Sequence, residues 1–254
     1  GRLAAMAAPA RVATLVVSDI PGDDPSLVAS GPTVPMATTR AEARHLAALY
    51  RLKLPQPAEA LLASDANPAP GPADPRFRHN STRIIASAAL SLDAAAAAAQ
   101  DAGLQAHILS DAVEGEARDV AGVLAALARE VSRRNRPFAR PAVLLSGGET
   151  TVTLRGTGRG GRNAEFLLAF AIAVEGTTGI TALAADTDGI DGAGDNAGAV
   201  CDGTTAARMR AAGIDPRAAL ANNDAYNAFR AIGGLFTTGP TGTNVNDFRA
   251  IIVR

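Results

Sequence analysis

The chain has 254 residues, of which 47% are hydrophobic and 19% are charged, so it can bury one large core or two ordinary ones. The 24 basic and 25 acidic residues leave a net charge of −1, which argues against bulk binding to nucleic acid or to a membrane surface. One cysteine, Cys201, excludes a disulfide framework within the chain, and no apolar run approaches the roughly 20 residues of a membrane span. We therefore expect a cytoplasmic globular protein.

The N-terminal residues, Gly1-Arg2-Leu3-Ala4, contain neither an initiator methionine nor the layout of a signal peptide. An apolar strand follows almost at once. We expect the chain to begin inside a longer protein.

Residues 12–17 (VATLVV) form a Val-rich run, which predicts a buried strand with polar residues at its end. Residues 39–52 have helical spacing, with Thr39 as the expected N-cap. Residues 55–75 carry many prolines and little periodicity, which predicts a loop. We place a domain boundary near the end of this loop, between residues 78 and 79.

From residue 83 onward, predicted strands alternate with predicted helices, a pattern typical of a mostly parallel, doubly wound α/β sheet. The stretch 150–154 (TTVTL) differs, because its polar and apolar residues alternate as in a half-exposed antiparallel strand. The other strands are expected at 83–87, 105–109, 142–145, 180–185, 235–238 and 250–253, and the helices at 90–102, 115–133, 163–174, 204–212 and 224–232.

Three predicted strands end in polar loops, and ligands bind at the carboxyl ends of strands in open α/β sheets. The first loop (SDIPGDDPSLVASGPT, 18–33) offers Asp19, Asp23 and Asp24, which suit a metal ion or a substrate hydroxyl. The alternative is that these side chains only cap their own backbone in Asx-turns.

The second segment (SGGETTVTLRGTGRGGRNAE, 146–165) favours an anion site. Gly147 and Gly148 allow backbone N–H groups to converge on an anion, and Arg159 and Arg162 add bidentate phosphate binding. The helix that begins near Asn163 adds the favourable N-terminal end of its dipole. We predict phosphate-handling chemistry here.

The same segment contains a second, competing pattern. Gly156, Gly158 and Gly161 match G-x-G-x-x-G, and Asp186 follows at about the distance of a ribose-binding acid, as in a nicotinamide dehydrogenase. Against this stand the alternating strand before the loop, the two arginines inside it, and the surplus of carboxylates after Asp186. We interpret the glycine pattern as a decoy and keep the dehydrogenase as the alternative.

The third loop (DTDGIDGAGDNAGA, 186–199) lacks the closing Glu of an EF-hand and suits a Mg²⁺-nucleotide or a substrate hydroxyl better, unless it is only a solvated acidic turn. For the fourth (TGPTGTNVNDFR, 238–249), with Asn244, Asn246 and Asp247, both ligand binding and simple chain reversal stay open. The scattered histidines indicate no His-based site, and we treat Cys201 as structural.

Five stretches together carry a family resemblance: SDIPGDDP…ASGPTVP, LLSGGETTVTLRGTGRGGRNAE, ALAADTDGIDGAGDNAGA, LANNDAYNAF and TGPTGTNVNDFRAIIV. They closely resemble the motifs of the glycerate 2-kinases of the MOFRL type, whose members have often been labelled hydroxypyruvate reductases. The resemblance covers nearly the whole chain, from about residue 11 to residue 253. One departure is Met36, where the family is expected to carry an acidic residue.

The resemblance implies a two-domain α/β fold. Residues 1–78 would be the tail of a Rossmann-like N-terminal domain, and residues 79–254 a second α/β domain with a mixed sheet that includes the MOFRL segment at about 142–252. The family also carries an upstream Gly-Lys-Ala motif whose lysine serves catalysis, whereas the lysine of this chain is Lys53. We therefore expect the isolated chain to have little or no kinase activity.

The activity implied by the resemblance is phosphorylation of D-glycerate to 2-phosphoglycerate with ATP and Mg²⁺, in a cleft between the two domains. Arg162 and Asp188 are the expected catalytic residues, and Asp186 and Asp188 the expected metal ligands. The expected substrate- and nucleotide-binding residues are Ser18, Asp19, Asp24, Ser30, Gly31, Thr33, Ser146, Gly147, Gly148, Glu149, Arg159, Asn163, Asp191, Asn196 and Asn244.

Glycerate is the expected small-molecule partner, nucleic acid and membrane are not expected partners, and a homodimer is the assembly considered. An NAD(P)-dependent hydroxypyruvate reductase is the first alternative function. A non-catalytic ligand-binding remnant is the second.

Overall fold

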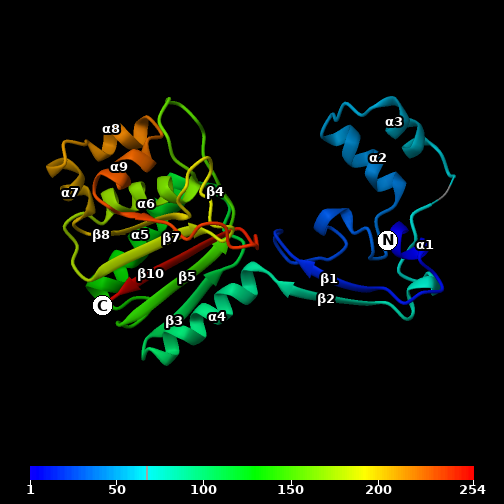
Figure 1. Cartoon of the computed structure of the whole chain (residues 1–254), viewed down its shortest axis with the longest axis horizontal. Coiled ribbons are helices and arrows are strands. Elements are labelled where there is room, and N and C mark those ends of the chain that lie inside the picture. The colour runs from blue at the N-terminus through cyan, green and yellow to red at the C-terminus, as the bar shows by residue number, and fades with distance from the viewer. Residues whose placement is uncertain (67) are drawn as a thin grey trace. The chain divides into compact units, whose positions relative to one another are not determined.

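A computed structural model describes residues 1–66 and 68–254, and the chain divides into two compact units (Figure 1). The first unit comprises Gly1–Val16 and Asp23–Ile85, and the second Val17–Gly22 and Ala86–Arg254. The boundary expected between residues 78 and 79 thus falls within the first unit, and the assignment of these parts to two domains stays a prediction.

The first unit is built from short elements. Its helices are α1 (Arg2–Met6), η1 (Val28–Ser30), α2 (Arg40–Leu49), α3 (Gln56–Ala63) and η2 (Pro75–Phe77), and its strands, which pair with each other, are β1 (Ala13–Val17) and β2 (Ser81–Ala86). The last residue of each strand belongs to the second unit. The strand predicted at 83–87 therefore pairs with β1 and does not enter the large sheet.

Two predictions in this unit have different outcomes. The expected N-cap at Thr39 is confirmed, because its side chain accepts from the Glu42 backbone while the Glu42 carboxylate accepts from the Thr39 backbone, a capping box. The loop predicted at 55–75 is wrong in part, because α3 lies inside it; Asn67 lies outside the described residues. Pro57 stands in the first turn of α3, where a missing N–H costs nothing.

The second unit contains a six-stranded sheet with helices on both faces (Figure 1). The strands of this sheet are β3 (Gln105–Ser110), β5 (Ala142–Gly148), β7 (Ile180–Asp186), β8 (Gly198–Asp202), β9 (Leu235–Phe236) and β10 (Asp247–Val253), and the unit also contains the short strands β4 (Gly115–Glu116) and β6 (Thr150–Thr151). Its helices are α4 (Ala88–Asp101), α5 (Ala117–Arg134), α6 (Arg162–Ala173), α7 (Thr205–Ala211), α8 (Pro216–Ala221) and α9 (Ala225–Ala231).

The strand order of the large sheet is β3-β5-β10-β7-β8-β9. β3 and β5 are parallel, whereas β10 runs antiparallel to both β5 and β7, and β8 is antiparallel to β7. The mixed sheet is therefore confirmed, and the mostly parallel sheet expected from the alternation of elements is wrong. The last strand of the chain inserts between β5 and β7, and no local pattern in the sequence encodes that insertion.

The stretch predicted as a strand at 150–154 is shorter and differently paired than expected. β6 covers Thr150–Thr151 and pairs in parallel with β4 in a separate two-stranded sheet. After Thr151 the chain leaves the strand and enters the Gly-rich loop. β8 and α8 were not predicted, since each is a short run of mostly small residues.

The core of the second unit lies mainly between the sheet and the helices α5 and α6. On this face Phe166, Phe170 and Ile251 are fully buried. On the opposite face Leu92 of α4 packs against Val143 and Leu145 of β5. Among the helices that the structure describes, none is both long and apolar enough to cross a membrane.

We predict that Phe170→Ala lowers the free energy of unfolding of the second unit by about 3–5 kcal/mol, because the ring is fully buried beside Phe166 and its loss leaves a cavity. Urea unfolding followed by far-UV circular dichroism measures the change. Val123→Ala, at an exposed position of α5, is the control and should shift the value by less than about 0.5 kcal/mol. Equal losses in the two variants would contradict this picture of the core.

Candidate active site

The second unit contains an open cavity of 560 Å³ lined by five residues of the predicted site. Those five are Glu149, Arg162, Asp186, Asp188 and Asn244. The remaining lining residues are threonines, glycines and aliphatic side chains: Thr150, Thr151, Val152, Leu154, Gly160, Gly161, Ile190 and Gly192. Three carboxylates and one guanidinium thus face the cavity.

The order of the strands explains why these residues meet. Asp186 ends β7 and Gly148 ends β5, so both lie at the carboxyl edge of their strands. Because β10 is antiparallel to both, its first residue, Asp247, lies at this same edge, paired in register with Gly148 on one side and Asp186 on the other. An acid from the end of the chain therefore joins residues from its middle.

Arg162, the first residue of α6, binds three carboxylates at once. Its Nε donates to Asp247 Oδ1 at 2.7 Å, one terminal nitrogen to Asp186 Oδ2 at 2.7 Å, and the other to Glu149 Oε1 at 2.6 Å. Burial alone would lower the pKa of Arg162, but the three carboxylates outweigh it and raise this pKa. The guanidinium is thus permanently charged and fixed in direction.

The three partners of Arg162 differ in how firmly they are held. The Asp247 side chain is 0% exposed, that of Asp186 is 7% exposed and that of Glu149 is 51% exposed. Burial raises the pKa of Asp186 to about 6, and the nearby carboxylates Asp188 and Asp247 add to the rise while Arg162 opposes it. The cluster carries more negative than positive charge, which favours a cationic guest.

Asp247 connects Arg162 to a second arginine. Its Oδ1 also accepts from the side-chain amide of Asn163 at 2.8 Å, and its Oδ2 accepts from Arg249 at 2.6 Å and from the Thr150 backbone at 3.2 Å. The sequence left Asp247 undecided and did not single out Arg249. Their only sequence signal is a pair of charges on one face of an otherwise apolar strand.

In the Gly-rich loop 155–161, the backbone N–H groups of residues 155–159 donate to other groups of the protein. The side chain of Asn223 accepts from Arg155 and Gly156, and Asn222 accepts from Thr157 with its side chain and from Gly158 with its carbonyl. The Asp224 carboxylate accepts from Arg159. The LANNDAYNAF motif therefore anchors this loop, which leaves those five amides no free hydrogen for a phosphate.

The glycines of this loop have a steric reason. A Cβ at Gly156 would collide with Asn222, one at Gly158 with Asp224, and one at Gly161 with Asp191. The G-x-G-x-x-G spacing reflects close packing of the loop on neighbouring turns. It does not form the pyrophosphate cradle of a dinucleotide fold, which agrees with its interpretation as a decoy.

The N-terminus of α6, expected to attract an external anion, already has an internal one. Asp191 accepts from the backbone N–H groups of Asn163 and Ala164 at 2.9 and 2.8 Å and also contacts the Asn163 amide. Asp191 is 1% exposed, and its burial raises its pKa to about 6 although these hydrogen bonds oppose the rise. The carboxylate caps the helix from inside the protein and does not line the cavity.

Other predicted residues of the second unit also lie away from the cavity lining. Arg159 stacks over the Tyr226 ring at 3.9 Å, and the Asn196 amide donates to the Gly198 carbonyl. Ser146, Gly147 and Gly148 belong to β5 and pair with β10, so the expected glycine loop is the end of a strand. Gly148 has a φ of 107° and abuts Val113, where a side chain would not fit.

The first polar loop divides between the two units. Ser18 and Asp19 belong to the second unit, where Ser18 is buried and the Asp19 carbonyl accepts from the Asn246 amide at 2.6 Å. Asp24, Ser30 and Gly31 belong to the first unit, and the Asp24 carboxylate accepts from the Ser26 backbone two residues on. That contact is the Asx-turn of the alternative interpretation.

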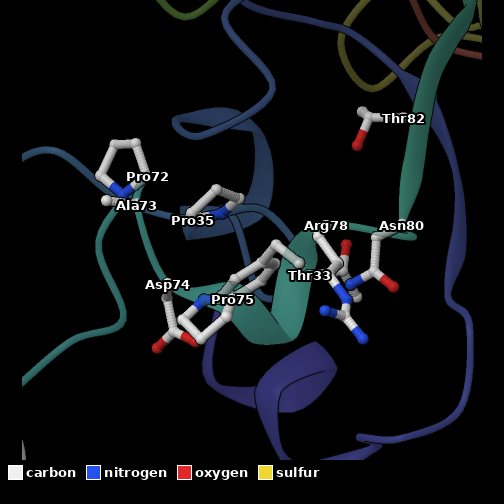
Figure 2. Close-up of a pocket in the computed structure, with 10 residues that line it drawn as sticks. Thr33, Pro35, Pro72, Ala73, Asp74, Pro75, Arg78, Asn80 and Thr82 are labelled. Carbon is white, nitrogen blue, oxygen red and sulfur yellow. The ribbon is translucent and has the colours of Figure 1, made fainter.

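A second cavity, of 360 Å³, lies within the first unit and is lined by Thr33 of the predicted set. Figure 2 shows Thr33, Arg78 and Asn80 together at one end of it and Asp74 at the other. The Thr33 hydroxyl accepts from Thr14, and the Asn80 side chain accepts from the Val12 backbone. These hydrogen bonds join the start of β1 to Thr33 and to the turn before β2.

The chain resembles known proteins along its whole length. The profile of the MOFRL family matches residues 142–247, and that of a domain of unknown function (DUF4147) matches residues 1–63. An Agrobacterium vitis protein named "Putative hydroxypyruvate reductase" is 54% identical over 256 residues, which cover 100% of this chain and 65% of that protein. The crystal structure of glycerate kinase from Thermotoga maritima has a TM-score of 0.90 at 37% identity, over 100% of this chain and 60% of its own.

The glycerate kinase of Macaca fascicularis is 33% identical over 299 residues, which cover 100% of this chain and 75% of that protein. The chain belongs to the MOFRL-type glycerate kinase family. The resemblance carried by the five motifs is thereby confirmed, as is the α/β fold with a mixed sheet. This family member spans about two thirds of the Agrobacterium relative and three fifths of the Thermotoga structure.

Two carboxylates at the cavity of this MOFRL-type chain could hold a magnesium ion together with the phosphates of a ligand. Within residues 1–66 and 68–254, no group of three or more His, Cys, Asp or Glu side chains forms a metal site by itself. Asp186 and Asp188 both line the cavity with oxygen donors. Mg²⁺ is commonly held by one or two carboxylates plus substrate phosphates, so two carboxylates suffice.

The buried cap of α6 gives a pH-dependent prediction. The folded pKa of Asp191, about 6, lies above its ordinary value of 3.8, so the folded chain binds more protons between these values. The stability that Asp191 contributes is therefore full below its unfolded pKa and is lost as the pH rises through 6. The unfolding free energy of the wild type minus that of Asp191→Asn measures this contribution. We expect this difference to be about 2 kcal/mol larger at about pH 4.5 than at about pH 7.5.

Urea unfolding at the two pH values measures this difference. Asp101→Asn, an exposed carboxylate at the end of α4, is the control and should show no comparable change. A difference of the opposite sign would mean that Asp191 stays ionised throughout.

Proposed function

We propose that the protein transfers the γ-phosphoryl group of ATP to the 2-hydroxyl of D-glycerate, giving 2-phosphoglycerate and ADP. The observation that carries the proposal is Arg162, held beside Asp186 and Asp188 at the cavity of a chain that belongs to the glycerate kinase family. Phosphoryl transfer requires mainly positioning and charge neutralisation, which a fixed guanidinium and metal-binding carboxylates supply.

Arg162 neutralises the charge that develops on the transferred group. Its anchor is the buried Nε contact with Asp247, while its contact with Glu149 is half-exposed. An exposed ion pair is worth only about 0–1 kcal/mol, so a phosphate oxygen can replace Glu149 without disturbing the anchor. The terminal nitrogen released from Glu149 then donates to a phosphate oxygen, while the other terminal nitrogen stays bonded to Asp186.

Asp188 and Asp186 complete the proposed site. Asp188 accepts from the Ile190 backbone with one oxygen, which orients its carboxylate at the cavity, where it accepts the proton of the substrate hydroxyl or shares a metal ion with Asp186. A bound Mg²⁺ would neutralise the phosphates of ATP. Because three carboxylates line the cavity against one arginine, such a cation is what makes the lining compatible with a polyanion.

The hydroxypyruvate reductase is the second candidate because a 54% identical relative bears that name. A reductase requires a dinucleotide site, and the sequence pattern that suggested one is the loop whose amides bind Asn222, Asn223 and Asp224. The geometry therefore favours the kinase. NADH oxidation with hydroxypyruvate in the absence of ATP would reverse this preference.

We predict that Arg162→Ala lowers the kcat of glycerate-dependent ADP release by at least about 10³-fold, the usual effect of an arginine that stabilises a transferred phosphoryl group. A coupled ADP-release assay on the full-length gene product measures it. Arg155→Ala, an exposed arginine of the same Gly-rich segment that does not line the cavity, is the matched control and should retain wild-type kcat. Unchanged turnover in Arg162→Ala would refute the assigned role.

A further inference from the structure

Arg249 is a fully buried arginine on the central strand of the sheet. The odd-numbered residues of β10 face the core between the sheet and the helices α5 and α6, and two of them, Ile251 and Val253, are apolar members of that core. Arg249 precedes them on the same face and its side chain is 0% exposed. A guanidinium is costly to remove from water, so its partners must account for its presence.

Arg249 donates to one carboxylate and to two neutral oxygens. One terminal nitrogen donates to Asp247 Oδ2 at 2.6 Å and to the Thr150 hydroxyl at 3.0 Å, and the other donates to the Gly147 carbonyl at 3.4 Å. The guanidinium also lies 5.2 Å from the centre of the Phe166 ring. These contacts fix the guanidinium group of Arg249 between the end of β5 and the Asp247 carboxylate.

Asp247 divides its two oxygens between two tasks. Oδ2 is held from the core side by Arg249 and Thr150, while Oδ1 holds Arg162 and Asn163 at the start of α6. A carboxylate is rigid, so fixing one oxygen fixes the direction in which the other accepts. The aim of Arg162 into the cavity thus depends on what binds Oδ2.

We propose that Arg249 is a positioning residue of the phosphoryl-transfer site, acting through Asp247 to hold Arg162 in the direction that reaches the ligand. Arg249 itself does not line the cavity, so its effect must pass through Asp247. The proposal rests on the proposed kinase function.

The competing partners of Arg162 show what Arg249 prevents. Glu149 and Asp186 also attract the guanidinium, and the Glu149 side chain is half-exposed. If Asp247 turned, Arg162 would lose its buried anchor at Nε and would follow these acids. A small displacement of a group that contacts the reacting atoms lowers the rate much more than the affinity.

The test compares Arg249→Lys and Arg249→Met with Ile251→Ala in the full-length gene product. Arg249→Met removes the contacts with Asp247. Arg249→Lys keeps a positive charge at this position but lacks the planar guanidinium group with its several donors. Ile251→Ala removes a buried side chain from the same face of the same strand without touching Asp247. Each variant is assayed for glycerate-dependent ADP release below its own unfolding transition.

We expect Arg249→Met to lower kcat by about 10–100-fold, the usual effect of losing a residue that orients a site group, with KM for glycerate changed less than about threefold. Arg249→Lys should recover part of the loss, and Ile251→Ala should lose stability but keep wild-type kcat. Wild-type kcat in Arg249→Met, or an equal loss in Ile251→Ala, would overturn the proposal.

A second measurement keeps the proposal testable if Arg249→Met does not fold or the wild type shows no kinase activity. The Nε–H proton of Arg162, identified by its absence from Arg162→Lys, should exchange slowly in ¹⁵N-arginine spectra because it is bonded to buried Asp247. Arg249→Lys should speed this exchange by about tenfold or more, a factor that corresponds to 1.4 kcal/mol, whereas Ile251→Ala should not. Slow exchange in Arg249→Lys would overturn the positioning role, whereas an inactive wild type would overturn only the kinase assignment.

Discussion

The site depends on one buried carboxylate, that of Asp247, which lies between two arginines. Arg162 approaches it from the start of α6 and Arg249 from within the central strand. Each oxygen of this buried carboxylate accepts from one of the two guanidinium groups, and loss of Asp247 would leave Arg249 without its ion pair in the core. Arg162 lines the cavity, whereas Asp247 and Arg249, which hold its Nε side, do not.

The antiparallel insertion of β10 makes this arrangement possible. In a parallel sheet the first residue of a strand lies at the edge opposite to the ligand site. Here the reversed strand places its beginning, Asp247, beside the ends of β5 and β7. The MOFRL segment matched at 142–247 ends at this residue, so the family pattern covers both the middle of the sheet and the acid that completes the site.

The sequence predicted those parts of the structure that local patterns determine. Thr39 was identified as an N-cap because capping needs only four neighbouring residues, and Arg162, Asp186 and Asp188 were placed at strand and helix ends that do form one cavity. Asp247 was left undecided and Arg249 was missed, because their contacts arise from the position of β10 between two distant strands. The Gly-rich loop was interpreted as anion-binding since its sequence does not show that Asn222 and Asn223 already occupy its amides.

The internal cap of α6 has a consequence for selectivity. A helix end with free amides binds almost any small oxyanion, and sulfate or inorganic phosphate would compete there with the intended ligand. Asp191 fills that position permanently from inside the protein. Asp191 thus occupies the position that an external anion would take. In the function proposed above, phosphate recognition then rests on the guanidinium and the carboxylates that line the cavity.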